Sequence, residues 1–147
     1  RKTDAVIAMG VGGAADRLAS RIAPRPFWHA TLIPDPNMSA ALRGQKIFAF
    51  AGIGRPEKFF DMLERDGAQL VERQSLADHA PFDPVTLDAL KARARAGGLI
   101  PVTTEKDAAR LGPASWPELK IVPVSFASPD EDAIIATLQH TLAHRRV

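Results

Sequence analysis

Short apolar runs alternate with segments of helical spacing along this chain, and glycine or proline stands at most of the junctions. The runs typical of strands are residues 46–51, 69–76, 99–102 and 121–126, and the segments typical of helices are residues 56–66, 84–96, 104–111 and 130–144. Because a helix between two strands returns the chain to the same edge of a sheet, this order predicts an α/β fold. We expect a largely parallel sheet flanked by helices, in a three-layer α/β/α sandwich.

The helix ends are marked by residues with local physical preferences. Pro56 stands where the first turn of a helix tolerates a missing N–H, and Gly67 can end that helix in the left-handed conformation. Asp83 before a proline predicts an N-cap for the next helix. Thr104 followed three residues later by Asp107 has the form of a capping box.

The first part of the chain is patterned differently. Residues 4–9 are typical of a strand and residues 14–22 of a helix, and four prolines then flank the β-prone residues 27–33. Prolines in these places favour an edge ribbon or a connector over a central strand. The sequence therefore predicts a strand-helix segment with an interdomain hinge at residues 1–36, and one α/β domain at residues 37–147.

Composition narrows the functional classes. The 147 residues carry a net charge of +2 and a pI near 9.3, with Lys and Arg scattered instead of forming the stripe that a nucleic-acid interface needs. Weak attraction to phosphate or an anionic lipid surface remains compatible with this charge. There is no cysteine, which excludes a thiolate nucleophile, and the longest apolar run, residues 47–53, is too short to span a bilayer. No signal peptide pattern opens the sequence, so we expect a cytosolic, soluble chain.

The predicted topology gathers three loops. If residues 46–51, 69–76 and 99–103 form parallel neighbouring strands, the segments that follow them emerge at one carboxyl edge, where open α/β sheets bind ligands. One of these segments contains Asp78 and His79. An imidazole titrates near neutral pH and can accept the proton of a hydroxyl nucleophile, although a solvated loop histidine beside a turn-capping aspartate is the commoner situation.

The same edge offers two candidate contacts for phosphate. Gly52 and Gly54 followed by Arg55 and a helix start resemble a phosphate-binding turn, because helix N-termini present free N–H groups to anions. Glu57 in the first turn would repel phosphate, so a purely structural tight turn is the favoured alternative. Lys106 can steer an anionic substrate or simply be solvated.

A second interpretation concerns dinucleotide binding. Gly10, Gly12 and Ala15 match the spacing of a Rossmann fingerprint, and Asp35 follows at about the distance of a ribose-binding carboxylate. Asp35 lies between two prolines, which would be an awkward end for the required central strand. A non-catalytic docking domain is a further alternative. No metal site is predicted, since His140 and His144 have no third ligand beside them.

Several blocks of this sequence resemble the C-terminal domain of tetraacyldisaccharide 4'-kinases, in the family's order and approximate spacing. They cover about residues 46–111 and consist of residues 48–54, residues 56–60, Leu63, residues 67–68, Asp78-His79 with Pro81, and residues 102–108 with Arg110-Leu111. Each block alone is weak evidence, but their order together is specific. Residues 1–45 resemble the family more loosely.

This resemblance implies a kinase that transfers the γ-phosphate of ATP to the 4'-hydroxyl of the tetraacyldisaccharide 1-phosphate precursor of lipid A. It places Asp78 and His79 at the active site, where the histidine works with an aspartate from the other half of the enzyme. Adjacent residues of an extended chain point to opposite sides, so Asp78 and His79 do not form a dyad with each other.

The resemblance also implies partners. ATP and Mg²⁺ would be held mainly by an N-terminal P-loop domain, since no Gly-Lys-Ser or Gly-Lys-Thr loop occurs here. We therefore expect an excised C-terminal half of a two-domain P-loop-like kinase, inactive alone. Its other partners would be the lipid A precursor and an anionic membrane surface, with the full-length protein peripheral on the cytoplasmic face of the inner membrane. Nucleic acid is not an expected partner.

Overall fold

The computed structural model describes residues 4–9, 17, 19–21, 24–77, 82–112 and 115–144. The chain divides into two compact units. One, here called the central unit, is Pro34–Val124, and the other, here called the terminal unit, combines Arg1–Ile33 with Ser125–Val147. The sequence-based division had placed residues 125–147 with the central residues, whereas their contacts group them with the first 33 residues.

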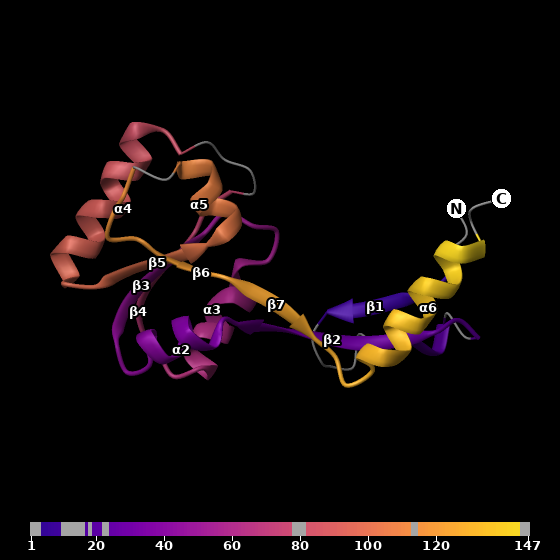
Figure 1. The fold of residues 1–147 in the computed structure, drawn as a ribbon. Coiled ribbons are helices and arrows are strands. Elements are labelled where there is room, and N and C mark those ends of the chain that lie inside the picture. The colour runs from indigo at the N-terminus through magenta and orange to yellow at the C-terminus, as the bar shows by residue number, and fades with distance from the viewer. Residues whose placement is uncertain are drawn as a thin grey trace. The chain divides into compact units, whose positions relative to one another are not determined.

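The central unit is built on a four-stranded sheet (Figure 1). Its strands are β3 (Lys46–Ala51), β4 (Gln69–Ser75), β5 (Ile100–Thr104) and β6 (Lys120–Val122), and their order is β4-β3-β5-β6. All three pairings are parallel, and Ala49 lies opposite Arg73 on one side and Val102 on the other. The predicted parallel sheet is therefore confirmed, and the carboxyl ends of its strands share one edge.

Helices cover both faces of this sheet. They are α2 (Pro36–Leu42), α3 (Pro56–Arg65), α4 (Pro84–Gly97) and α5 (Glu105–Leu111). Figure 1 shows α4 and α5 on one face and α2 and α3 on the other, which gives the expected three layers. On the α4 face, Phe48 and Phe50 are fully buried, and Phe50 stacks on Trp116 with 5.8 Å between ring centroids.

Local signals set the helix ends as predicted. The Asp83 carboxylate accepts a hydrogen bond from the Thr86 backbone N–H at 2.7 Å, and α4 begins at the following proline. At the other end of α4, Gly98 has φ +58°, and Gly67 after α3 has φ +98°. Both glycines adopt the left-handed conformation that a side chain disfavours, which is why the helices stop there.

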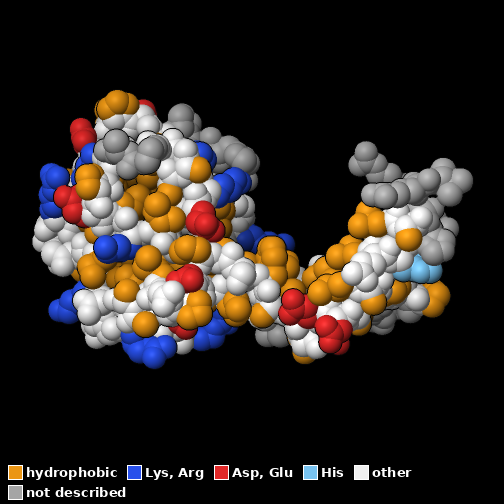
Figure 2. Space-filling model, in the orientation of Figure 1, with side chains coloured by type: hydrophobic (Ala, Val, Ile, Leu, Met, Phe, Trp, Pro, Cys, Tyr) orange, Lys and Arg blue, Asp and Glu red, His pale blue; other side chains and the backbone are white. Residues whose placement is uncertain are grey.

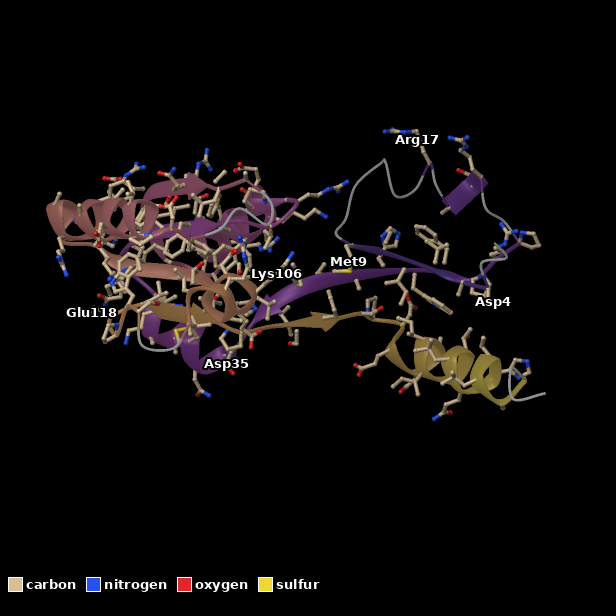
Figure 3. All side chains as sticks on the ribbon, turned by 90° about the horizontal axis from the view of Figure 1, so that it is seen from above. Asp4, Met9, Arg17, Asp35, Lys106 and Glu118 are labelled. Atoms are coloured by element: carbon tan, nitrogen blue, oxygen red, sulfur yellow. The ribbon has the colours of Figure 1, made fainter. Side chains whose placement is uncertain are left out.

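Helix α2 is absent from the sequence-based prediction, and Asp35 explains it. The Asp35 Oδ1 atom accepts hydrogen bonds from the N–H groups of Asn37 and Met38, each at 3.0 Å, so this residue is the N-cap of α2. Asp35 is labelled in Figure 3 where β2 gives way to α2. Its carboxylate therefore has a structural role that competes with ribose recognition. Gly10, Gly12 and Ala15 of the same hypothesis lie outside the described residues.

The terminal unit contains a second, smaller sheet. Its strands are β1 (Val6–Met9), β2 (Phe27–Pro34) and β7 (Val124–Ala127), in the order β1-β2-β7, and helix α6 (Glu131–His144) follows. An edge position for residues 27–33 was wrong, because β2 is the middle strand and pairs in parallel with β1, whereas the role of this segment as an interdomain hinge stays a prediction. Its prolines lie at the ends, where they do not remove an N–H from the interior of the ladder.

The predicted strand at residues 121–126 is in fact two strands. Pro123 interrupts it, so that β6 joins the central sheet and β7 joins the smaller one. The Pro123 carbonyl accepts a hydrogen bond from the Asp35 N–H at 2.9 Å. A proline cannot donate to a ladder, and here it marks the point where the chain passes from one sheet to the other.

No helix among the described residues combines the length and the apolar character needed to cross a bilayer.

Candidate functional site

The carboxyl edge of the central sheet brings together the ends of β3, β4 and β5. The Leu76 N–H donates to the Ala51 carbonyl at 2.9 Å, so the chain leaving β4 stays beside the end of β3. A Cβ atom placed on Gly52 would lie 3.4 Å from the Ala77 carbonyl oxygen. The predicted convergence at this edge is confirmed for Gly52, Ala77 and the start of α5. Residues 78–81, with Asp78 and His79, lie outside the described residues, so their roles stay predictions.

A buried carboxylate organises this edge. The Asp107 side chain has no exposed area, and its Oδ2 atom accepts hydrogen bonds from the Gly52 N–H at 2.9 Å and from the Thr104 hydroxyl at 2.8 Å. Its Oδ1 atom forms an ion pair with Arg110 at 2.9 Å. Both oxygens of the buried charge are therefore compensated, as a buried carboxylate requires. We call these four residues the Asp107 cluster.

Arg110 connects this cluster to Phe82, the residue that follows the segment with His79. Its side chain is 22% exposed, and its Nη1 atom also lies 3.4 Å from the Gly52 carbonyl oxygen. The guanidinium carbon stands 5.0 Å from the centre of the Phe82 ring, the geometry of a cation–π contact. Ala77 precedes residues 78–81 and Phe82 follows them, so Gly52 of the cluster lies close to the residue before that segment and Arg110 contacts the residue after it.

The preceding threonine has a framework role. The Thr103 hydroxyl is fully buried and donates to the Phe50 carbonyl at 2.8 Å, which ties β5 to β3 just before the edge. The Thr104 hydroxyl also accepts the Asp107 N–H at 3.2 Å, as expected of a helix cap. Both hydroxyls are thus used inside the protein, and the predicted helix cap at Thr104 is confirmed.

The glycine turn after β3 is shaped by close packing. The N–H of Gly52 is donated to Asp107, so this amide is already used within the protein. A Cβ at Gly52 would lie 3.2 Å from both Asp107 Oδ1 and Arg110 Nη1, which explains a glycine at this position. Gly54 and Arg55 are exposed, and their contact with phosphate stays a prediction.

Glu57 lies in the first turn of α3, next to this glycine turn. It accepts a hydrogen bond from the Ser75 hydroxyl at 3.3 Å and lies 3.9 Å from Arg73. Its carboxylate therefore interacts with two residues of β4, in addition to complementing the positive end of the helix. Glu57 thus reduces the positive potential available to a phosphate group at this turn.

Lys106 lies in the first turn of α5 and is exposed at the same edge (Figure 3). A cation in this position can attract an anionic substrate toward the loops. Its contact with substrate stays a prediction.

The residue that opens α4 has a perturbed acidity. The hydrogen bond from the Thr86 N–H, assisted by the Thr86 hydroxyl, lowers the pKa of Asp83 below its ordinary value. Asp83 stands two residues after the 78–81 segment. The shift follows from its capping role, which anchors the chain where it enters α4.

The arrangement of acidic and histidine side chains bears on metal binding. In the described parts of the chain, no group of three or more His, Asp or Glu residues is arranged to hold a metal ion. Asp107 is the buried carboxylate of this edge, and both its oxygens already accept protein hydrogen bonds. It therefore does not fit the role of a Mg²⁺ ligand.

The importance of the Asp107–Arg110 pair was not predicted. The capping box accounted for Asp107, and Arg110 entered only as part of the sequence resemblance. A signal was available in hindsight, because an acid and a base at i, i+3 directly after a buried strand can form an ion pair on one helix face. The hydrogen bond to Gly52 joins residues 55 positions apart and has no local signature.

Comparison with known proteins gives a consistent result. A protein family described as tetraacyldisaccharide-1-P 4'-kinase matches residues 1–143. A tetraacyldisaccharide 4'-kinase of Xanthobacter autotrophicus is 46% identical over 148 residues, covering 97% of this chain and 40% of that protein. One from a Bradyrhizobium species is 39% identical, covering 99% of this chain and 44% of that protein. The chain thus spans about 40% of the length of such relatives. No solved structure matches it.

Proposed function

This chain belongs to the tetraacyldisaccharide-1-P 4'-kinase family, and we propose that it is the C-terminal part of an enzyme that phosphorylates a lipid A precursor. In this proposal ATP donates its γ-phosphoryl group to the 4'-hydroxyl of a tetraacyldisaccharide 1-phosphate. The observation that supports a role for this chain is the Asp107 cluster, in which Gly52 lies close to Ala77 and Arg110 contacts the Phe82 ring, the residues directly before and after the segment carrying His79.

The proposed division of labour leaves ATP and Mg²⁺ mainly to the remainder of the longer protein. The sequence contains no Gly-Lys-Ser or Gly-Lys-Thr loop, and the Asp107 oxygens are occupied by protein donors. Bound Mg²⁺ would neutralise charge on the transferred phosphoryl group. The central unit would contribute groups that receive the sugar hydroxyl and orient it.

His79 is the proposed participant in proton transfer. The 4'-hydroxyl must lose a proton as it attacks phosphorus, and a neutral imidazole can accept a hydrogen bond from that hydroxyl. An aspartate of the other part would act with it, and Asp78 would help to orient the loop. Gly54, Arg55 and Lys106 are proposed contacts for the phosphate groups of the substrate.

Replacement of His79 tests this role. In the full-length protein, we expect His79→Ala to lower turnover by roughly 10² or more, because a group positioned for proton transfer contributes typically that much. Turnover would be measured with radiolabelled ATP and the tetraacyldisaccharide 1-phosphate in detergent micelles. Gln69→Ala is a suitable control, since Gln69 is exposed at the amino edge of the same sheet. Equal turnover in the two variants would remove His79 from the mechanism.

Nucleotide titration tests the division of labour. We expect the 147-residue chain to bind Mg-ATP no more tightly than about 1 mM in isothermal titration calorimetry, and to show no kinase activity. Micromolar affinity for Mg-ATP would contradict the proposal. Micromolar affinity for NAD would instead support the dinucleotide-binding alternative, which the capping role of Asp35 disfavours.

We also propose a cellular location. The substrate is a lipid, so the full-length enzyme would work peripherally at the cytoplasmic face of the inner membrane. The net charge of +2 would favour contact with an anionic surface, although only weakly.

A further inference from the structure

Arg110 joins three separate segments of the central unit at the carboxyl edge. Its Nη1 atom pairs with Asp107 Oδ1 at 2.9 Å and lies 3.4 Å from the carbonyl oxygen of Gly52, which follows β3. Its guanidinium carbon stands 5.0 Å from the centre of the Phe82 ring, just before α4. A planar guanidinium can make these contacts at the same time, because it donates hydrogen bonds in its plane and stacks through its face.

The orientation of Arg110 is fixed by the carboxylate of Asp107. That carboxylate is fully buried, and its Oδ2 atom accepts the Gly52 N–H at 2.9 Å and the Thr104 hydroxyl at 2.8 Å. Gly52 leaves little room for rearrangement, because a Cβ there would lie 3.2 Å from both Arg110 Nη1 and Asp107 Oδ1. A buried charge with these hydrogen bonds holds its partner in one geometry.

Phe82, the ring that Arg110 contacts, is anchored to the core of the central unit. It packs edge-on against the buried Phe50 ring, with 6.1 Å between the two centroids. The next residue, Asp83, is the N-cap of α4. The Phe82 ring therefore has the core on one contact and the guanidinium on another, so removal of the guanidinium frees one of its contacts.

The chain is anchored before residues 78–81 as well. The Leu76 N–H donates to the Ala51 carbonyl at 2.9 Å, at the end of β3. The four residues between Ala77 and Phe82 can extend by no more than about 3.6 Å each. The anchors on the two sides therefore limit where His79 can lie.

The charge of Arg110 is used within the protein. Its side chain is 22% exposed, and its partner Asp107 is fully buried. Figure 2 shows Lys and Arg side chains at separate places on the visible face of the central unit, with Asp and Glu among them. Because a carboxylate 2.9 Å away compensates it, Arg110 adds little positive potential for a substrate phosphate. Its geometry favours a contribution through position and not through attraction.

We propose that Arg110 is a positioning residue for phosphoryl transfer, which holds Phe82, and through it the segment with His79, where the imidazole meets the sugar hydroxyl. This inference rests on the proposed function, because it needs His79 to act on that hydroxyl. Arg110 itself touches neither the sugar nor the nucleotide. A displacement of about 1 Å in a group positioned for reaction can lower the rate by about 10²-fold, so loss of the guanidinium acts on turnover.

Steady-state kinetics of the full-length enzyme test the positioning role. Arg110→Met keeps an unbranched apolar stem but removes the planar charged group. We expect kcat to fall by about 10- to 10²-fold, because the imidazole is misplaced. The KM values for Mg-ATP and for the tetraacyldisaccharide 1-phosphate should change by less than about twofold, since no substrate contact is removed.

Arg93→Met is the matched control. Arg93 also pairs with a carboxylate, that of Glu72 at 2.9 Å, and its guanidinium carbon lies 5.4 Å from the centre of the Phe48 ring. These contacts lie beside the middle of β3 and β4, where Phe48 and Glu72 are opposite each other. The kcat of Arg93→Met should stay within about twofold of wild type, although the same kinds of contact are lost.

A second substitution separates positioning from general support of the fold. In the His79→Ala enzyme, we expect Arg110→Met to lower kcat by less than about twofold further, because a residue that acts through His79 has nothing left to position. Equal losses with and without His79 would make Arg110 a support of the whole site and would overturn the proposal. A raised KM for the tetraacyldisaccharide 1-phosphate that persists in His79→Ala would make Arg110 a substrate ligand, which overturns it too.

Poor folding and failure of the proposed function are distinguishable from failure of this inference. Arg110→Lys keeps a positive charge opposite Asp107 and replaces Arg110→Met if that variant does not fold; it lacks the planar group, so kcat should still fall at least ~5-fold. Wild-type turnover in His79→Ala would reject the proposed proton transfer and this inference with it. Lost turnover in His79→Ala with wild-type kcat in the Arg110 variants would reject the positioning role alone.

Discussion

The central and terminal units differ in how they bury apolar side chains. The central unit has fully buried Phe48, Phe50, Phe60, Ile47 and Met62 between a parallel sheet and helices on both faces. The terminal unit has exposed Leu138 and Leu142 on helix α6. Among the described residues, apolar burial is therefore concentrated in the central unit. The proposed catalytic edge lies on the central unit.

Truncation of the central core should have the largest effect on stability. Phe50→Ala removes a side chain with no exposed area that stacks on Trp116, and we expect it to lower the free energy of unfolding by about 3–5 kcal/mol. Chemical denaturation of the 147-residue chain, followed by circular dichroism, measures this. Leu138→Ala in the same chain should change it by less than about 0.5 kcal/mol, since Leu138 is mostly exposed there. Similar losses in both variants would erase the contrast between the units.

Neutralising the buried carboxylate should have the next largest effect. Asp107→Asn removes the charge that pairs with Arg110, which we expect to cost about 3 kcal/mol, the lower end for such pairs because Arg110 is partly solvated. The measurement is again the denaturation midpoint. Asp88→Asn, at an exposed position on α4, is the control and should be nearly neutral. A neutral Asp107→Asn would mean that the cluster does not organise the edge.

Substitution of the glycine that ends α4 should have a moderate effect on stability. Gly98 has φ +58° and would place an added Cβ in open space, so Gly98→Ala meets backbone strain without a clash. We expect a loss of about 1 kcal/mol in unfolding free energy. Thermal denaturation measures it. An unchanged midpoint would indicate that the helix ends differently in solution.

Removal of the carboxylate that caps α4 should have the smallest effect on stability, and this effect should depend on pH. The pKa of Asp83 is lower in the folded chain than its ordinary value of 3.8, so its stabilising contribution is present above that value and is lost as the pH falls through the folded-state pKa. The melting temperature of Asp83→Ala should therefore fall below wild type at neutral pH and approach it in acid. A constant difference at all pH values would contradict this assignment.

Local signals in the sequence predicted much of the central unit. The residues at the ends of α3 and α4 act through their own backbone preferences, so Pro56, Gly67 and Asp83 could be interpreted without a structure. The position of β2 within its sheet and the division of residues 121–126 at Pro123 could not be predicted, because the partner of a strand lies far along the chain. The convergence of loops at the carboxyl edge followed from parallel topology, whereas the hydrogen bond between Gly52 and Asp107 is a tertiary contact that no local pattern encodes.

Hydrogen exchange of unmodified protein tests the contrast between the units most directly. In the 147-residue chain, the amides of β3 should exchange only through global unfolding, while those of α6 should exchange nearly as fast as an unstructured peptide. Equally slow exchange in α6 and β3, or fast exchange in β3, would contradict this contrast between the terminal and central units.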